Sequence, residues 1–455
     1  MASRWSSPPG LGADEHGASR CTRAKKPRNT PALPPLLAAA VAGPPSLARP
    51  VSEVHTMPDR RGATLLEDLP EDIINKILVL LPSKDVGRCR VVNTSMCSAT
   101  STPEFMLQHH RRQPSLPIVD GLGRPANHVV LGDAAAGASN QQLWPFLSSS
   151  KRSIENNLAA VCDGFLIVSW ENKFYICNPV TRKHALLPQP QAGQYIRNIV
   201  VGFYRHHPTG EYRVLWVSGP DYSFISNLYV VTVGSDRPRC ISVRLPAEEK
   251  LWNKLPSSNS SAVHHRGSLH WHPYGTNDIT GDVRDIVVFD TETESFRRMH
   301  SPTQQCRYGN LFDMEGTLAL WSGSVSKSTS MDVWVMQDYE AETWAFKYRI
   351  DVSMVETSRQ LYLTSLKKKK SRPLESTVQL LNDMAVLNES ELLIRFNCKH
   401  VLRCGIDGKF LGIVNIGKSQ YQMFLTGHRL KESIVPIPGH EMQEDEEAPF
   451  STGHV

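Results

Sequence analysis

The feature that most constrains this chain is a series of short β-strand signals that recurs from about residue 115 onward. Each segment is rich in β-branched and aromatic residues and is bounded by Gly, Pro, Asn or Asp. The clearest segments are Phe165–Trp170, Phe174–Cys177, Ile199–Tyr204, Tyr212–Val217, Leu228–Val233, Ile286–Phe289, Leu318–Trp321, Val333–Met336, Trp344–Arg349 and Leu392–Phe396. The pattern predicts a large all-β domain over residues 115–435.

A weak internal repeat groups these strands into hairpins. A turn that contains Gly and is followed by Leu or Phe leads into a strand at Asp163–Leu166, Gly267–Leu269 and Gly316–Leu318. A second strand then ends in Asn178–Thr181, in Asp290–Thr293 or in the variant Asp338–Trp344. Repeated hairpins with aromatic anchors are typical of a propeller-like array, in which blades bury their faces against one another. The spacing is too irregular to predict the number of blades.

A helical pattern precedes the β region, over residues 65–112. Prolines at positions 70, 82 and 103 fall where helices begin or end. Apolar residues at spacings of three and four predict a helix over Pro70–Leu81, with Ser83 as the N-cap of a second helix and Pro103 opening a third. The apolar stripe on the first helix is wider than so small a unit can bury. We therefore expect a partner to cover part of it.

Both ends of the chain are predicted to be disordered tails. Residues 1–60 hold ten prolines and four glycines, with Trp5 as the only aromatic residue. Such a segment cannot bury enough apolar area to fold. An organelle transit peptide is the alternative for this segment, although its proline density opposes an amphipathic helix. Residues 436–455 include the acidic run Glu444–Glu447 and are predicted to be a second, solubilising tail.

Charge and hydropathy argue against two classes of partner. The 455 residues include 50 Lys plus Arg and 45 Asp plus Glu, and the excess of basic residues lies mostly in residues 1–60. Binding of nucleic acid by the folded part would need a concentrated basic face, which is not indicated. No run approaches the roughly 20 apolar residues of a membrane-spanning helix. We therefore expect a soluble protein with no nucleic acid partner and no membrane insertion.

The nine cysteines of the chain are scattered and form no C-x-x-C pair. They predict neither a disulfide framework nor a zinc module, and they fit a reducing compartment. No local signature marks a catalytic cysteine either. We expect no cofactor, no metal site and no catalytic residue.

The helical unit resembles the F-box in three runs, namely Leu69–Ile74, Ile77–Pro82 and Lys84–Val92. The resemblance implies docking to the Skp-type adaptor of an SCF (Skp–cullin–F-box) ubiquitin ligase, and through that adaptor to the cullin. By the same resemblance, the residues that would pack against the adaptor are Leu69, Pro70, Ile73, Ile77, Leu78, Leu81, Pro82 and Val86.

The chain departs from the F-box pattern at Met96. The family commonly has Cys-Lys-Ser-Trp where this chain has Asn93–Met96, so Met96 replaces the usual tryptophan. Methionine fills an irregular apolar gap but orders it less well, which leaves the strength of adaptor docking open. A β-propeller scaffold with a decayed F-box is therefore one alternative function.

The β region resembles the F-box-associated, kelch-like domains of plant F-box proteins. The residues that carry this resemblance are Cys177–Arg182, Phe289–Phe296, Asp332–Tyr339 and Cys404–Phe410. The resemblance implies a multidomain α + β chain, with a small N-terminal helical F-box followed by a large all-β, propeller-like domain. It also implies a non-catalytic substrate receptor, whose β domain holds a protein for ubiquitination and proteasomal degradation. The identity of that protein substrate is unknown.

A nucleotide-binding enzyme is the second alternative function. Gly412–Ser419 matches G-x-x-x-x-G-K-[ST], and Ile286–Asp290 ends in an acidic residue that could hold Mg²⁺. However, no alternating strand and helix pattern surrounds either segment, and the middle of the loop is apolar. We expect two β-strands here rather than a P-loop.

Histidines and cysteines form two further groups that could suggest a metal. His264, His265, His270 and His272 cluster in sequence, but no nearby carboxylate or thiolate completes a ligand set, so we expect histidines that face solvent from a strand. The spacing of Cys398, His400 and Cys404 fits no common zinc pattern, and we expect burial in strands to explain the cysteines.

Two basic runs, Lys25–Arg28 and Lys367–Arg372, are short enough to be nuclear import signals or solvated loops. The expected location is the nucleus, the cytoplasm or both.

Overall fold

The computed structural model describes residues 69–122, 127–132, 141–142, 157–170, 172–191, 193, 195–220, 227–241, 261–272, 285–302, 308–323, 330–365, 377–414 and 422–439. The predicted tail of residues 1–60, and residues 440–455 of the predicted acidic tail, lie outside these residues. Within this part of the chain, no helix has the length and apolar character needed to cross a membrane.

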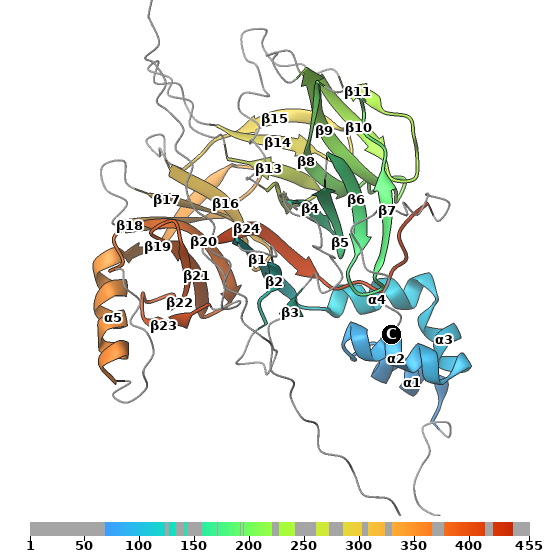
Figure 1. The fold of residues 1–455 in the computed structure, drawn as a ribbon, viewed down its shortest axis with the longest axis horizontal. Helices are drawn as coiled ribbons and strands as arrows, with labels where there is room; N and C mark the ends of the chain where they lie inside the picture. The colour runs from blue at the N-terminus through green and yellow to red at the C-terminus, as the bar shows by residue number, and fades with distance from the viewer. Residues whose placement is uncertain are drawn as a thin grey trace, which may run out of the picture. The chain divides into compact units, whose positions relative to one another are not determined.

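Four short helices form the N-terminal part (Figure 1). They are α1 (Glu71–Leu78), α2 (Ser83–Val92), α3 (Thr94–Thr100) and α4 (Pro103–Arg112). Helix α1 begins directly after Pro70, and Glu71 and Asp72 in its first turn complement the positive end of the helix dipole. Thr102 caps α4 by accepting a hydrogen bond from the Phe105 N–H.

Three details of this helical part differ from the prediction. Helix α1 ends at Leu78 rather than Leu81, because the N–H groups of Leu80 and Leu81 bond three residues back and tighten the last turn before Pro82. The prediction that Ser83 caps α2 is wrong, since Pro82 holds the N-cap position and Ser83 is the buried first residue of the helix. Helix α3 was not predicted.

Asn93 explains the extra helix. Its side-chain oxygen accepts hydrogen bonds from the N–H groups of Ser95 and Met96, at 2.8 and 3.3 Å. An asparagine at the N-cap satisfies donors that the first helical turn leaves without partners. The local sequence signal for α3 is therefore the Asn93 cap, and not a periodic pattern of apolar residues.

The described residues from Ser115 onward form six four-stranded antiparallel sheets, which are the blades of a propeller (Figure 1). Blade 1 consists of β24 (Gln422–Lys431), β1 (Ser115–Leu122), β2 (Asn127–Val130) and β3 (Gln141–Gln142); blade 2 of β4 (Asn157–Cys162), β5 (Phe165–Trp170), β6 (Lys173–Asn178) and β7 (Lys183–Leu187); blade 3 of β8 (Ile196–Arg205), β9 (Tyr212–Pro220), β10 (Asn227–Thr232) and β11 (Arg239–Ile241).

Blade 4 consists of β12 (Val263–His265), β13 (Ser268–Trp271), β14 (Ile286–Asp290) and β15 (Ser295–Met299); blade 5 of β16 (Tyr308–Met314), β17 (Thr317–Gly323), β18 (Ser330–Asp338) and β19 (Thr343–Asp351); blade 6 of β20 (Leu381–Asn388), β21 (Glu391–Phe396), β22 (His400–Gly405) and β23 (Phe410–Ile413). The predicted fold class is confirmed, and the number of blades, which the sequence could not predict, is six in the described residues.

Blade 1 closes the ring, because its strands come from both ends of the propeller sequence. The late strand β24 pairs with the early strand β1, from Ser115 opposite Lys431 to Leu122 opposite Gln422. Figure 1 shows the red β24 beside the blue-green β1. Full closure of this kind leaves no gap between the first and last blades.

Apolar clusters fill the spaces between blades. In the described residues there are six such clusters, and each combines side chains from two adjacent blades. Between blades 2 and 3, for example, the ring of Phe174 meets the edge of buried Trp216 with 4.7 Å between centroids. Aromatic pairs of this geometry add to the apolar area that blades bury against each other.

The repeat seen in the sequence corresponds to two kinds of turn. The Gly-containing turn that joins the first two strands has two successive residues with positive φ, as at Asp163 and Gly164, and again in blades 4 and 5. Turns of this type match the twist of the hairpin strands and favour Gly at the second position. The predicted hairpins are confirmed.

The second turn joins the last two strands of blades 2, 4 and 5. Its first residue, Asn178, Asp290 or Asp338, accepts hydrogen bonds from the N–H groups two and three residues later. These side-chain hydrogen bonds stabilise the turn by giving its backbone N–H groups an acceptor.

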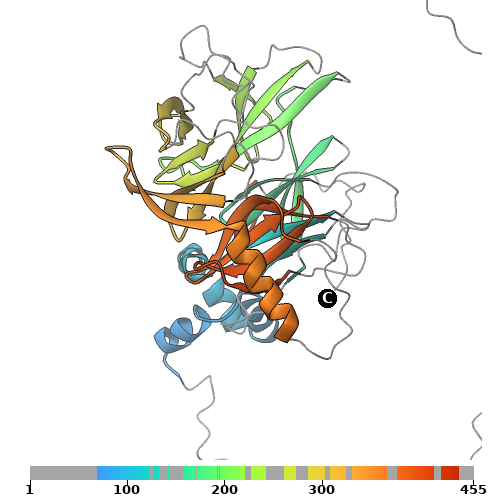
Figure 2. The same cartoon turned by 90° about the vertical axis from the view of Figure 1, so that its left-hand side faces the viewer.

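A fifth helix, α5 (Val352–Ser365), lies between blades 5 and 6 and was not predicted. Figure 2 shows it along the outside of the propeller. Its buried residues Val352 and Val355 belong to the apolar cluster between these two blades. Tertiary packing therefore outweighs the low helix propensity of its β-branched residues.

Candidate functional site

The helical part has its own apolar core, and a residue from the far end of the chain completes it. Leu78, Val86 and Phe105 are buried together with Ile434, which lies in the segment that follows β24. We call residues 432–439 the strap. The half-buried Met96, at the position of the usual F-box tryptophan, packs against the same core.

Apolar side chains that this core does not cover remain on α1 and just after it. Ile73 and Ile77 are 39% and 40% exposed, and Leu80 is 67% exposed. They follow one another at spacings of four and three residues, which places them along one side of the helix and its last turn. This row is the predicted apolar stripe, and we call it the docking face.

The structure divides the eight predicted adaptor-binding residues into two groups. Ile73, Ile77 and the prolines at positions 70 and 82 are exposed, whereas Leu78 and Val86 are buried in the helical core. Leu69 and Leu81 are half-buried, and Leu81 packs against that core. The exposed members can touch a partner directly, and the buried members hold the helices that present them.

Three exposed apolar residues are absent from the predicted adaptor-binding set. Leu80 belongs to the docking face, and Val91 and Val92 at the end of α2 are almost fully exposed. The helical period places Leu80 in the apolar stripe, because it follows Ile77 by three residues, but the F-box resemblance did not carry it into the adaptor-binding set. Val91 and Val92 gave no such signal, because two adjacent valines fit the end of a buried helix equally well.

Polar contacts fix the helical part to blades 1 and 2 and to the strap. His110 of α4 donates from Nδ1 to the Glu432 carbonyl oxygen at 2.9 Å, and its Nε2 lies 3.6 Å from Asp163 Oδ1. Lys431 Nζ donates to the Arg111 carbonyl oxygen at 2.8 Å. The helices are thus bonded to the propeller, as well as connected to it by the chain.

Asp163 links three elements at this junction. The Tyr212 hydroxyl of blade 3 donates to its carboxylate at 3.0 Å, on the side opposite His110. Burial opposes ionisation of the carboxyl, but the nearby His110 and the hydrogen bond from Tyr212 outweigh burial and hold its pKa below the usual value. Asp163 is therefore charged at neutral pH and accepts a hydrogen bond from the Tyr212 hydroxyl.

The strap lies against the turns of blade 2. The Asn178 side-chain amide donates to the carbonyl oxygens of Ser433 and Val435, at 3.0 and 2.8 Å. Gly164 lies so close that an added Cβ would be 2.4 Å from the Cβ of Ser433. Only glycine fits at this position, which also has φ of +83°.

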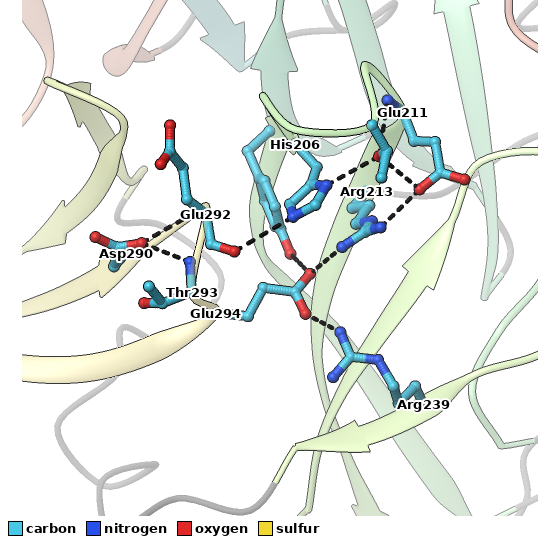
Figure 3. Close-up of polar contacts among 10 residues, drawn as sticks. His206, Glu211, Arg213, Arg239, Asp290, Glu292, Thr293 and Glu294 are labelled. Atoms are coloured by element: carbon cyan, nitrogen blue, oxygen red, sulfur yellow. Dashed lines mark hydrogen bonds and ion pairs between the residues drawn. The ribbon is translucent and has the colours of Figure 1, made fainter.

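A second polar network joins blades 3 and 4 (Figure 3). The Glu294 carboxylate accepts hydrogen bonds from the Tyr204 hydroxyl at 2.7 Å, from Arg213 Nη1 at 2.8 Å and from Arg239 Nη2. Glu342 holds the equivalent position in the next blade, and it accepts from Arg297 and His300. Both glutamates have positive φ at the end of the second repeated turn. These ion pairs join side chains of adjacent blades.

The histidine cluster is structural in the residues described here. The prediction that these strand histidines face solvent is wrong for His270 and His272, which are buried. His270 Nδ1 donates to the Val263 carbonyl oxygen, and its Nε2 accepts from the Tyr339 hydroxyl at 2.9 Å. Burial lowers the pKa of His270 to about 4. Among the described side chains, no group of three or more His, Cys, Asp and Glu is placed to hold a metal ion.

The remaining sequence candidates have ordinary places in the blades. Asp290, at the end of the suspected Mg²⁺ strand, caps a turn in blade 4, and Gly412 lies in β23 of blade 6. Lys418 and both basic runs lie outside the described residues. Cys404 is buried in β22, but the prediction of burial is wrong for Cys398, which is exposed in a turn with φ of +54°.

Two family models match the chain, one for each of its parts. Residues 66–108 match the F-box domain. Residues 139–369 match the F-box associated beta propeller domain. The two matches correspond to the helical part and to most of the propeller.

Similar proteins come from Arabidopsis thaliana. F-box protein At5g18160 is 24% identical over 298 residues, which is 61% of this chain and 69% of that protein. F-box protein At3g07870 is 26% identical over 315 residues, covering 63% of this chain and 73% of that protein. F-box protein At5g49610 is 23% identical over 312 residues, covering 64% and 79%.

Proposed function

The chain belongs to the family of the F-box associated beta propeller domain, and from that membership we propose that it is the substrate-recognition subunit of an SCF ubiquitin ligase. In this role the F-box binds a Skp-type adaptor, and through it the cullin. The propeller binds a target protein, which the ligase ubiquitinates for proteasomal degradation. The chain itself supplies no catalytic group and acts as an adaptor in the nucleus, the cytoplasm or both.

The docking face is the observation that carries this proposal. Ile73, Ile77 and Leu80 expose apolar area that the helical core leaves uncovered. When a partner helix covers an exposed apolar row, the burial favours binding by about 25 cal/mol for each Å² of apolar surface removed from water. We assign direct adaptor contact to these three residues.

The buried members of the predicted set have a different role in this proposal. Leu78 and Val86 pack inside the F-box, so they position α1 and α2 and do not themselves reach the adaptor. Exposed Val91 and Val92 supply a second apolar contact at the end of α2. Substitution of a buried member would unfold the F-box, whereas substitution of an exposed one would leave its fold intact.

The proposed role in degradation can be tested in cells with proximity labelling. The Ile77→Asp Leu80→Asp variant should still bind target proteins through the propeller but should no longer deliver them to the ligase. Its targets should therefore be labelled as in wild type and should accumulate without a proteasome inhibitor. The matched control is Phe346→Asp, which places a single aspartate on an exposed apolar residue of β19.

Two outcomes of this labelling would contradict the proposal. One is an identical set of labelled proteins, at identical abundance, for wild type and the F-box variant. The other is accumulation of the same proteins with the Phe346→Asp control. Either result would show that the proteins bound by the propeller are not degraded through an SCF ligase.

A further inference from the structure

Two segments of the described residues share the sequence pattern Arg-Arg-x-x-Ser. One is Arg111–Ser115, which joins the end of α4 to the start of β1, and the other is Arg297–Ser301, at the end of β15. Two arginines placed three and four residues before a serine form a charge pattern by which a kinase with acidic side chains selects a substrate. The structure gives the two segments different surroundings.

The arginines of the first segment are available to an enzyme, whereas those of the second are already paired. Arg111 and Arg112 are exposed, and within the described part of the chain neither pairs with a carboxylate. Arg297 and Arg298 each pair with a carboxylate, at 2.8 and 3.7 Å. The serine of the first segment is exposed, and that of the second is half-buried. Only the first segment therefore presents both the charge pattern and the hydroxyl.

Ser115 lies where the backbone leaves α4 and enters the sheet. Gln113 has extended dihedral angles, with φ of −65° and ψ of 143°, and Ser115 is the first residue of β1. Its cross-strand partner Lys431 is the last residue of β24. The ends of helices and strands open at a low cost in free energy. An enzyme can therefore reach the Ser115 hydroxyl without opening a blade.

Two cations lie on the same face of the sheet as the Ser115 side chain. Lys431 is directly opposite in the antiparallel register, and Arg429 is diagonal to it. Arg429 Nε donates to the Ser115 hydroxyl at 3.1 Å, and Lys431 Nζ donates to the Arg111 carbonyl oxygen at 2.8 Å. Among the described residues, neither cation forms an ion pair with a carboxylate. Both are therefore placed to receive an anionic group carried by Ser115.

We propose that Ser115 is a phosphorylation site for an arginine-directed serine kinase, and that Arg429 and Lys431 hold its phosphate. In the reaction, Ser115 Oγ attacks the γ-phosphorus of ATP, the bond from that phosphorus to the β,γ-bridging oxygen breaks, ADP leaves, and the hydroxyl proton passes to a carboxylate of the kinase. The phosphate brings a charge of about −1.5 to −2 and three acceptor oxygens to the two cations. This inference goes beyond the proposed function and does not depend on adaptor docking.

The electrostatics of this position favour the phosphate on balance. The carboxyl end of α4 opposes negative charge, and Asp313 and Glu315 attract Arg429 from beyond ion-pair distance. Bonds from Arg429 and Lys431 to phosphate oxygens act at contact distance, so they outweigh these more distant charges. The phosphate therefore links β1 to β24 where the ring closes, next to the strap.

The first test treats the full chain with a purified arginine-directed serine kinase and MgATP, and follows each site by peptide mass spectrometry. Ser115 should be modified at least about tenfold faster than Ser301, the matched serine whose arginines are paired. Arg112→Gln should slow modification of Ser115 by a similar factor, whereas the control Arg298→Gln should leave it unchanged. Equal rates at the two serines, or equal rates at Ser115 in wild type and Arg112→Gln, would overturn the assignment of the site.

The second test measures whether the two cations hold the phosphate. Titration of the phosphorylated chain by ³¹P NMR should give the phosphate a second pKa about one unit below its usual value of about 6, because adjacent cations favour the dianion. Lys431→Gln and Arg429→Gln should each raise this pKa, and Lys431→Gln carries the test if Arg429→Gln unfolds. The control is Arg237→Gln at an exposed arginine of blade 3, which should leave the pKa unchanged. An ordinary phosphate pKa in wild type, or the same pKa in wild type and Lys431→Gln, would overturn the proposed role of the cations.

Discussion

Single buried carboxylates determine how neighbouring blades hold together. Glu294 of blade 4 has three donors from blade 3, and its side chain is only 9% exposed. Loss of such a group leaves Tyr204 without its acceptor, and Arg213 with only its bond to Glu211, in a region that water reaches poorly. The network therefore stabilises the contact between blades 3 and 4 only while its buried groups are all paired.

Glu294→Ala should lower the free energy of unfolding by about 3 kcal/mol, the usual range for breaking one side of a buried ion pair. The control is Glu292→Ala, because the Glu292 side chain is mostly exposed and should contribute little. Urea unfolding of both variants measures the difference. Equal losses for the two variants would show that the Glu294 network does not stabilise the blades.

His270 should make stability depend on pH. Its pKa is about 4 in the folded chain, below the ordinary value of 6.5, because burial disfavours the charged ring. The unfolded chain therefore binds the proton first, so the contribution of His270 is complete above pH 6.5 and is lost as pH falls toward 4. The loss over that window is about 3 kcal/mol, from 1.36 kcal/mol for each unit of pKa.

The comparison of wild type with His270→Gln isolates this effect. Burial raises the pKa of Asp383 to about 6, which acts with the opposite sign in the same range, but it acts in both proteins and cancels in the difference. The free energy of unfolding, measured from pH 7 to pH 4.5, should fall more steeply for wild type than for the variant. Parallel curves would contradict the assignment of a neutral, buried imidazole.

At the scale of elements, the strap is what joins the F-box to the propeller. Ile434 enters the F-box core, whereas Val435 and Ile437 pack against the cluster between blades 2 and 3. A segment from the C-terminal side of the propeller thus completes a core that forty residues of short helices could not complete alone. The F-box helices depend on the closed propeller for their stability.

Ile434→Ala should therefore lower the free energy of unfolding of the F-box by about 3 kcal/mol, the usual cost of truncating a buried isoleucine to alanine. Hydrogen exchange should become faster in α1, α2 and α4, with the blades unchanged. Ile437→Ala is the matched control, because it removes the same side chain from the strap where it faces the blades. Faster exchange of the F-box helices in both variants, or in neither, would contradict this role of Ile434.

Elements with local signals were predictable from sequence, and those held by distant contacts were not. The hairpins were predictable because Gly164 and Asn178 act on their own turns. Helix α5 was missed because its helical form depends on Val355 in a cluster with blade 6 and on the hydrogen bond that Glu356 accepts from the Val378 N–H. The docking face was predictable in part, since helical spacing places Ile73 and Ile77 together but cannot separate them from buried Leu78.

At the scale of the whole molecule, pairs of residues far apart in sequence decide the architecture. The pairing of β1 with β24 closes the ring, and it joins Ser115 to Lys431. The same strand leads directly into the strap, so closure of the propeller also places Ile434 in the F-box core. The sequence has no local signal for either contact, which is why blade number and the junction could not be predicted. The consequence is a propeller and a docking face that are built as one folded unit.

We propose that this unit binds a Skp-type adaptor through its docking face. The most direct test is calorimetric titration of the purified adaptor into the wild-type chain and into the Ile77→Asp Leu80→Asp variant, with Leu361→Glu on α5 as the control. We predict saturable binding to wild type and to the control, and binding at least about tenfold weaker to the docking-face variant. Equal affinity of the variant and wild type, or no binding by the correctly folded wild-type chain, would contradict the account.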